Sequence, residues 1–149
     1  MPAIRTCSQC GQKNRVTADH LGSTGRCGAC KSSLPPIAEP LAVDGELFDE
    51  VIKNATIPVL VDFWAAWCGP CRAAAPEVAR TAGNMAGKAL VLKVDTDKYP
   101  QLAERFGVRG IPNFVVFSGG QVVMQQAGLV DHNQMEKWLN SVPRAGIVA

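Results

Sequence analysis

The sequence has no long apolar segment. No stretch of it approaches the roughly 18 consecutive apolar residues that a membrane-spanning helix needs. The first residues, Met1 to Gln9, hold one charged side chain and no apolar run, which is unlike a secretory signal. We therefore expect a protein without a membrane partner that works in the cytoplasm, where thiols are kept reduced.

The chain also has little net charge. Its formal charge at pH 7 is +2, which is too small to predict nucleic acid as a partner. The charge is uneven, because residues 1–40 hold five basic and two acidic side chains, a net of +3, whereas the rest carries −1. Hydrophobic residues make up 47% and charged residues 19%, a balance typical of a globular protein. At 149 residues, the chain can form one domain of typical size and a small appendage.

Cysteine, in contrast, is well represented. A structural disulfide framework is not expected in a reducing compartment, so the six cysteines need another explanation. All six fall into C-x-x-C pairs, two of them separated by sixteen residues and the third far along the chain. The pairs are Cys7/Cys10, Cys27/Cys30 and Cys68/Cys71. This asymmetry indicates two different tasks.

The first two pairs have the spacing of a zinc site. Two C-x-x-C turns supply four thiolates in tetrahedral geometry, and a closed four-thiolate site predicts structural rather than catalytic zinc. The segment around them has few apolar residues, so we expect metal binding to provide its folding free energy, on the order of 10 kcal/mol. One alternative is that these pairs are additional redox centres. A second is that His20 is a ligand, although as a loop residue it is more simply explained as solvent-exposed.

A proline-rich stretch follows this segment. SSLPPIAEP, residues 32–40, has three prolines, and domain boundaries fall in stiff, extended stretches of this kind. We expect a zinc-binding knuckle over residues 1–34, a linker over residues 35–40 and a second domain over residues 41–149.

The second domain alternates between element types. Asp44 is a good helix N-cap before an apolar pattern of helical spacing, and Asp131 caps a last helix in which Trp138 is expected to be core. His132, next to that cap, is expected to be solvated. The other elements are a buried strand from Val59 to Ala65, a helix from the third C-x-x-C to Met85, a strand from Ala89 to Val94, a short helix from Tyr99 to Phe106, and a hairpin from Phe114 to Gln126. This order predicts an α/β fold with a mixed sheet between helices.

The third pair lies in a segment that resembles the active site of thioredoxins. The string VDFWAAWCGPC, residues 61–71, is similar to that site, and the likeness continues through Pro76, Val94-Asp95, GVRGIP at residues 107–112, and Gly128. It covers roughly residues 41–142. The N-terminal addition resembles the zinc-binding variety of bacterial thioredoxin, usually called thioredoxin 2. The resemblance implies the thioredoxin fold with a small zinc-ribbon-like domain in front of it.

The residues explain why this arrangement exchanges disulfides. Cys68 lies where a strand meets a helix, so the helix N-terminus lowers the pKa of its thiol, as it does in thioredoxins generally. Cys68 attacks a substrate disulfide, and the more sheltered Cys71 then displaces the reduced product. Pro70, after Gly69, fixes the first helical turn. Two facing core cysteines are the alternative, but Trp67 and Gly69-Pro70 are poor core residues.

Asp62 is unusual because a carboxylate within an apolar strand is costly unless it is paired. Its pKa should therefore be raised. The resemblance implies that Asp62 accepts the proton of Cys71 and that Lys93 is its neighbour. A satisfied core carboxylate is the alternative for Asp62, and the role of Lys93 is left open.

The resemblance also implies a substrate-binding surface. Ile111-Pro112 matches the cis-proline turn of the family, and the Ile111 backbone is expected to pair with an extended substrate segment. Trp67 and Gly128 are expected to line the same patch. Ala66, Arg72 and Asn113 depart from the residues that are common in the family, and no direction of effect is predicted for them.

Three functions are compatible with the sequence. We favour a protein disulfide reductase that NADPH-dependent thioredoxin reductase recycles, with structural zinc and a redox-active Cys68–Cys71 disulfide. The Gly-Pro dipeptide between Cys68 and Cys71 resembles reductants, whereas an oxidase or isomerase of this fold carries histidine there. The third function is a zinc-dependent, redox-regulated chaperone or interaction protein. Expected partners are the reductase and disulfide-containing proteins, with a monomer as the default state.

Overall fold

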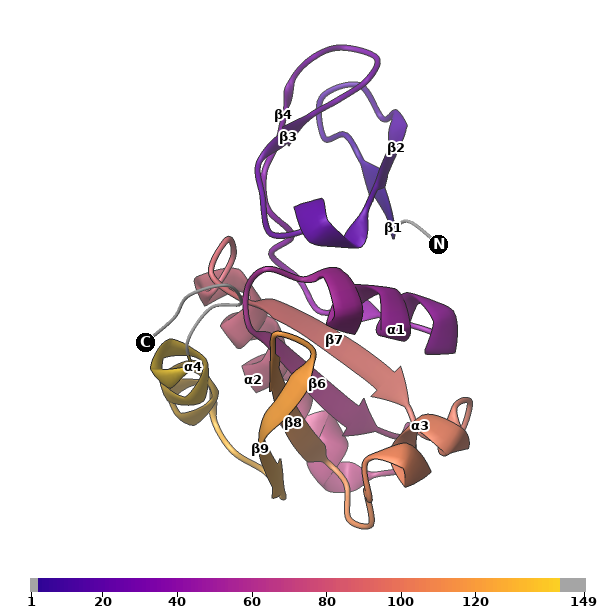
Figure 1. The fold of residues 1–149 in the computed structure, drawn as a ribbon, viewed down its shortest axis with the longest axis vertical. Helices are drawn as coiled ribbons and strands as arrows, with labels where there is room; N and C mark the ends of the chain where they lie inside the picture. The colour runs from indigo at the N-terminus through magenta and orange to yellow at the C-terminus, as the bar shows by residue number, and fades with distance from the viewer. Residues whose placement is uncertain (1–2, 143–149) are drawn as a thin grey trace.

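A computed structural model describes residues 3–142 of the protein (Figure 1). A small lobe of short strands lies above a larger lobe in which one sheet is covered by helices on both faces. Residues 1–2 of the expected knuckle and residues 143–149 of the expected second domain lie outside the described part. No helix of the described part is long and apolar enough to cross a membrane.

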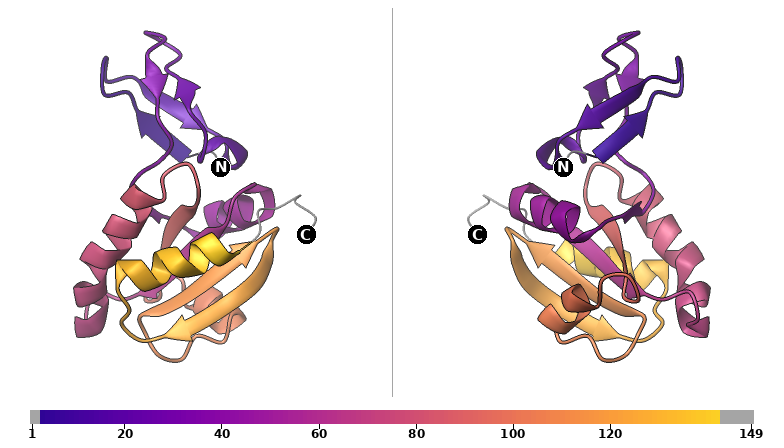
Figure 2. Two further views of the ribbon diagram at one scale, coloured as in Figure 1. Left: turned by 90° about the vertical axis from the view of Figure 1, so that its left-hand side faces the viewer. Right: turned by 90° about the vertical axis from the view of Figure 1, so that its right-hand side faces the viewer.

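The small lobe consists of two antiparallel hairpins and one helical turn. β1 (Ala3–Thr6) pairs with β2 (Lys13–Val16), and β3 (Gly25–Arg26) pairs with β4 (Ser33–Leu34). The 3-10 helix η1 (Ala18–His20) connects them. The loops of both hairpins, which carry the four cysteines, lie at the end of the lobe farthest from the large sheet (Figures 1 and 2).

The two cysteine loops are built alike. The Cys7 N–H donates to the Gln12 carbonyl at 2.8 Å, and the Cys27 N–H donates to the Ser32 carbonyl at 2.9 Å. The residue after the second cysteine of each pair is left-handed, with φ of 77° at Gly11 and 65° at Lys31. Each loop therefore turns its two sulfur atoms towards the two sulfur atoms of the other loop.

The large lobe contains a five-stranded sheet in the order β5-β7-β6-β8-β9. β6 (Val59–Trp64) is central, parallel to β7 (Leu90–Asp95) and antiparallel to β8 (Asn113–Ser118). The edges are β5 (Leu41–Ala42), parallel to β7, and β9 (Gln121–Ala127), antiparallel to β8. The predicted buried strands and hairpin are confirmed to within two residues.

Helices cover both faces of this sheet (Figure 2). α1 (Gly45–Asn54) and α3 (Pro100–Arg105) pack on the face that receives Val59, Val61 and Phe63 of β6. α2 (Gly69–Asn84) and α4 (His132–Ser141) pack on the other, which receives Leu60. The alternation of side chains along a strand therefore places Asp62 on the same face as α2. The side chains of Asp44 and Asp131 cap α1 and α4, and Trp138 is buried, as predicted.

The predicted linker is packed rather than free. Ile37 is buried, and its N–H donates to the Leu21 carbonyl at 3.1 Å. Leu21, after η1, is fully buried in the same core cluster as Phe48 of α1. A Cβ atom at Gly22 would collide with the side chain of Ile57. The composition indicated an extended segment here but not that the two lobes share one apolar core.

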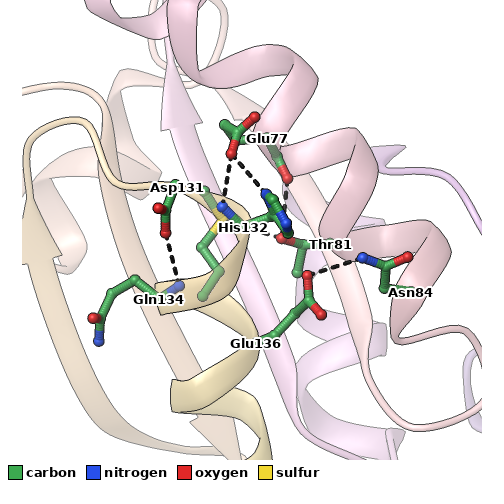
Figure 3. A network of polar contacts seen from close by, with 8 residues as sticks. Glu77, Thr81, Asn84, Asp131, His132, Gln134 and Glu136 are labelled. Atoms are coloured by element: carbon green, nitrogen blue, oxygen red, sulfur yellow. Dashed lines mark hydrogen bonds and ion pairs between the residues drawn. The ribbon is translucent and has the colours of Figure 1, made fainter.

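Polar contacts join α2 to α4 (Figure 3). Glu77 accepts from the His132 backbone N–H at 3.0 Å, and its carboxylate lies 2.8 Å from His132 Nδ1. Asn84 donates to Glu136 at 3.1 Å, two turns further along α2 and one turn further along α4. The prediction of a solvated His132 was wrong, because its ring, at the start of α4, lies against a carboxylate of the neighbouring helix, with its side chain 19% exposed.

Candidate active site and metal centre

A disulfide lies at the N-terminus of α2. Cys68 and Cys71 are bonded, with Cα atoms 5.2 Å apart, and both are buried. Cys68 is the N-cap of the helix, and its sulfur accepts a hydrogen bond from the Cys71 N–H at 3.2 Å. Pro70 occupies the first turn, where no N–H is required. After reduction, the Cys68 sulfur would face free N–H groups and the positive end of the helix dipole, which stabilise a thiolate.

The loop before β8 lies beside this disulfide. The Ile111-Pro112 bond is cis, as the resemblance implied, and the Ile111 carbonyl oxygen is 3.6 Å from Cys68 Sγ. The Gly128 N–H donates to the Pro112 carbonyl at 2.9 Å, which brings the end of β9 to the same place. The Ile111 backbone thus lies directly beside the Cys68 sulfur.

Trp67 directly precedes Cys68 and is exposed. Its side chain is 67% exposed, and its indole N–H donates to the Asp97 carboxylate at 3.2 Å. An exposed aromatic ring held by one hydrogen bond offers an apolar contact surface of fixed orientation.

Asp62 is buried beneath α2, with only 1% of its surface exposed. Desolvation raises the pKa of this carboxyl to about 7, although the charge of Lys93 acts to lower it. Asp62 Oδ1 has no hydrogen-bond partner among the described residues. A carboxyl group in this state can take up a proton near neutral pH.

Lys93 is the cross-strand partner of Asp62 in the β6–β7 register. Its ammonium group lies 4.6 Å from the centre of the Trp64 ring, a cation–π contact that holds the charge over the same face of the sheet. The structure therefore brings together Asp62 and Lys93, which lie 31 positions apart in the chain.

The four remaining cysteines form a compact cluster. Their sulfur atoms all lie within 4.8 Å of one another, with Cys7 to Cys30 at 3.7 Å and Cys10 to Cys27 at 3.6 Å. A tetrahedral zinc ion with Zn–S bonds of about 2.3 Å holds its sulfurs about 3.8 Å apart. The cluster therefore has the size that this ion requires, and His20 is not part of it.

The pKa values of these thiols are also consistent with a site for a bound cation. The backbone N–H groups of Cys30 and Ala29 outweigh desolvation and lower the pKa of Cys27 to about 6. The Gln12 backbone acts to lower the pKa of Cys10, but the thiols of Cys30 and Cys27 together with desolvation raise it to about 12. Without a positive ion, four such close sulfurs cannot all be thiolates, because the like charges repel.

Several residues of these sites were not predicted from the sequence. Asn14 donates to Cys27 Sγ at 3.6 Å and accepts from the Gly28 N–H at 2.9 Å, so it links the two cysteine loops. Asp97 orients Trp67. An asparagine within a short strand and an aspartate in an acidic turn are too common in proteins to indicate these partners, which lie 13 and 30 residues away.

The disulfide and the cysteine cluster are far apart. α2 begins at the disulfide, and near its other end Gly83 lies against the Ala38 carbonyl oxygen of the segment between the lobes. The 16 residues of α2 span about 24 Å, and the cysteine loops lie farther still (Figure 2). The two sulfur groups therefore belong to separate sites.

Comparison with known proteins agrees with this geometry. The thioredoxin family model matches residues 39–141, and the model described as thioredoxin 2, N-terminal, a zinc ribbon, matches residues 6–32. Thioredoxin C-3 of Corynebacterium nephridii is 36% identical over 137 residues, which are 92% of this chain and 93% of that protein. A thioredoxin of Haemophilus influenzae is 38% identical over 104 residues, 70% of this chain and 97% of that protein.

Solved structures show the same likeness. A mutant thioredoxin from Halobacterium salinarum superimposes with a TM-score of 0.66 at 36% identity, covering 75% of this chain and 96% of that one. The family models match both lobes, and the helix-capping disulfide and the four-cysteine cluster lie where each family's chemistry needs them. The chain therefore belongs to the thioredoxin family, as a thiol–disulfide oxidoreductase with an N-terminal four-cysteine ribbon.

Proposed function

We propose that this protein is a protein disulfide reductase that thioredoxin reductase recycles with electrons from NADPH. The observation that carries the proposal is the Cys68–Cys71 disulfide at the N-terminus of α2, next to the Ile111 backbone. Disulfide-containing proteins are its substrates, and the chain acts as a monomer. The reducing cytoplasm suits this role, because ligand thiols must stay reduced to hold a metal.

The reaction has two steps. In the reduced protein the Cys68 thiolate attacks one sulfur of a substrate disulfide, which forms a mixed disulfide and releases the other substrate sulfur as a thiol after it takes up a proton. Cys71 then loses its proton to Asp62 and displaces the remaining substrate thiol, which closes the Cys68–Cys71 disulfide. Two electrons pass to the substrate, and the reductase returns two electrons to the protein. Lys93 limits the cost of the charge on Asp62.

The surroundings of the disulfide select the substrate. An extended segment of the partner protein pairs with the Ile111 backbone, as in strand addition. Trp67, Pro112 and Gly128 border this segment, and the Ile111 carbonyl oxygen lies 3.6 Å from Cys68 Sγ. Gly69 and Pro70 form the first turn of α2 directly after the attacking cysteine.

The four-cysteine lobe has a structural role in this proposal. Cys7, Cys10, Cys27 and Cys30 would hold one Zn²⁺ per chain, which supplies charge compensation and folding free energy and leaves no open coordination position for catalysis. The domain division of residues 1–34, 35–40 and 41–149 remains part of the proposal, with Ile37 as the point where the lobes are joined.

The test is a coupled assay with thioredoxin reductase, NADPH and insulin as the disulfide substrate. We expect turnover by the unmodified protein and its loss, by at least about two orders of magnitude, in Cys68→Ser, because the nucleophile is gone. Ala73→Ser, on an exposed position of α2, is the matched control and should retain turnover.

Metal content is measured on the same samples. Cys68→Ser should keep one zinc ion per chain, whereas Cys10→Ser should lose it. Absence of turnover in the unmodified, zinc-loaded protein would overturn the reductase proposal. Loss of zinc from the Cys68→Ser variant would overturn the separation of the two sites.

A further inference from the structure

We propose that Asn113 and Gln125 are positioning residues that hold the Gly110–Pro112 loop in the shape that binds the substrate segment. Asn113 directly follows the cis-proline, and Gln125 lies on the edge strand β9. The inference rests on the proposed reductase function, because it concerns how the same site binds a protein substrate.

The two amides form a continuous chain of hydrogen bonds. Asn113 Nδ2 donates to the Gly110 carbonyl at 3.3 Å, and Asn113 Oδ1 accepts from Gln125 Nε2 at 3.2 Å. Gln125 Nε2 uses its other hydrogen on the Phe106 carbonyl at 2.9 Å. Three separate segments, the end of α3, the loop and β9, are therefore joined by two side chains.

Burial makes this arrangement specific. Asn113 is 5% exposed, one of few buried polar side chains in the described part of the chain, and its donor and its acceptor are both used. A buried amide that loses a partner costs more than a hydrogen bond contributes when it is formed, so the pair resists rearrangement. Gln125 is exposed but is held by its two acceptors.

The loop fixed in this way carries the atoms that meet the substrate. Gly110 precedes Ile111, whose carbonyl lies 3.6 Å from Cys68 Sγ, and Asn113 starts the strand that leaves the loop. The amide pair thus holds the loop at the Gly110 carbonyl, while the Gly128 N–H holds the Pro112 carbonyl from β9. Loss of the bond to Gly110 lets the Ile111 backbone depart from the extended geometry that strand addition needs.

This contact gives a structural role to Asn113, which departs from the residues that are common in the family. A threonine side chain at this position would be too short to reach both Gly110 and Gln125. Asn113 reaches both, together with a glutamine two positions from its direct cross-strand partner, Ala127.

The experiment compares Gln125→Met with Gln126→Met in the insulin assay. Methionine matches glutamine in length, adds no charge and cannot donate, and Gln126 is the exposed neighbour on the other face of β9. We expect Gln125→Met to raise the KM for insulin about two- to tenfold at unchanged kcat, as the loss of one or two neutral hydrogen bonds implies. Gln126→Met should match the unmodified protein.

A small aromatic disulfide is the second substrate, because it does not pair with a backbone. Its reduction rate should be unchanged in Gln125→Met. Asn113→Thr should raise the KM for insulin as Gln125→Met does. The effects of the two substitutions on KM should not add in the double variant, because both break the same chain of hydrogen bonds. Equal KM values for Gln125→Met and Gln126→Met, or an equal loss with both substrates, would overturn the positioning role. A failure of the proposed function is distinct, since the unmodified protein would then not reduce insulin at all.

Discussion

At the scale of single residues, the most consequential feature is a carboxyl group inside an apolar strand. Asp62 lies at the centre of the sheet, and Lys93 reduces but does not cancel the cost of its charge. Because burial raises its pKa to about 7, the folded protein holds a proton on Asp62 at pH values where the unfolded chain, with an ordinary value of 3.8, has released it. The group therefore destabilises the fold at neutral and alkaline pH.

Asp62→Asn should consequently stabilise the protein. The free energy of unfolding of the unmodified protein should fall as the pH rises from about 4 to about 7 and then level off. The variant lacks this titration, and at about 1.4 kcal/mol per pKa unit it gains up to roughly 4 kcal/mol at pH 8 and almost nothing at pH 4. Urea unfolding at both pH values is the measurement. An equal gain at both would show that the raised pKa is not the cause.

Individual residues differ in how far the sequence predicts them. Asp62 could be identified because a charged residue interrupts an apolar run, and the cysteine ligands because their spacing matches a tetrahedral ion. Asn113 was noted as a departure, but its effect could not be predicted, since its partner Gln125 is reached only when β8 and β9 pair. Contacts of this kind depend on tertiary structure, whereas the first two depend on residue type and local pattern.

At the scale of elements, α2 determines most of the site. The helix presents the disulfide at its first turn and packs on the sheet through Ala74, Val78 and Ala82. Its orientation is further held by Glu77, which bonds the ring and the backbone N–H of His132 at the start of α4. Interactions that fix α2 in this way also fix the direction in which the Cys68 sulfur points.

The Glu77 contact should be pH-dependent. Hydrogen bonds from the side chain and then the backbone of His132 lower the pKa of Glu77 below its ordinary 4.5. A lowered carboxyl pKa gives stability that is complete above 4.5 and is lost as the pH falls through the lower value of the folded state. Glu77→Gln should thus lower the thermal midpoint at pH 7 and lose its effect in strong acid. Glu104→Gln, exposed on α3, is the control, and an equal shift in both variants would contradict the α2–α4 contact.

Elements were the part of the fold that the sequence predicted best. Long apolar runs and Asp N-caps mark β6, β7, α1 and α4, and these agree with the structure. His132 was misassigned because a histidine after an N-cap is solvated unless a neighbouring helix supplies a carboxylate, and Glu77 is 55 residues away. Helix–helix contacts of this sort have no local pattern in the sequence.

At the scale of the whole molecule, the two lobes share one apolar core. Leu21 and Ile37 come from the segment before β5, yet they are buried together with Phe48 of α1. The folding free energy that a bound metal would add to the small lobe would therefore be partly transmitted to the large one. The sequence divides the chain into two domains, but the packing makes their stabilities interdependent.

Leu21→Ala should destabilise the large lobe, by about 2–5 kcal/mol if the cavity does not collapse. All three tryptophans, Trp64, Trp67 and Trp138, belong to the large lobe, so their fluorescence during denaturation reports on that lobe alone. Removal of metal by a chelator should shift the same transition in the same direction. Ile4→Ala, exposed on β1, is the control. A tryptophan transition that neither Leu21→Ala nor chelation moves would show that the lobes fold independently.

The length of α2 has a consequence for the chemistry of the six sulfurs. A Cys68 thiolate attacks a disulfide within its reach, and the oxidised Cys68–Cys71 disulfide is in turn open to attack by a thiolate. A tethered partner at short range reacts as though it were highly concentrated. With the cysteine loops beyond the far end of a helix of about 24 Å, the folded chain does not bring Cys68 against the four clustered cysteines. One polypeptide can therefore cycle a reactive dithiol beside four oxidisable cysteines without cross-linking itself.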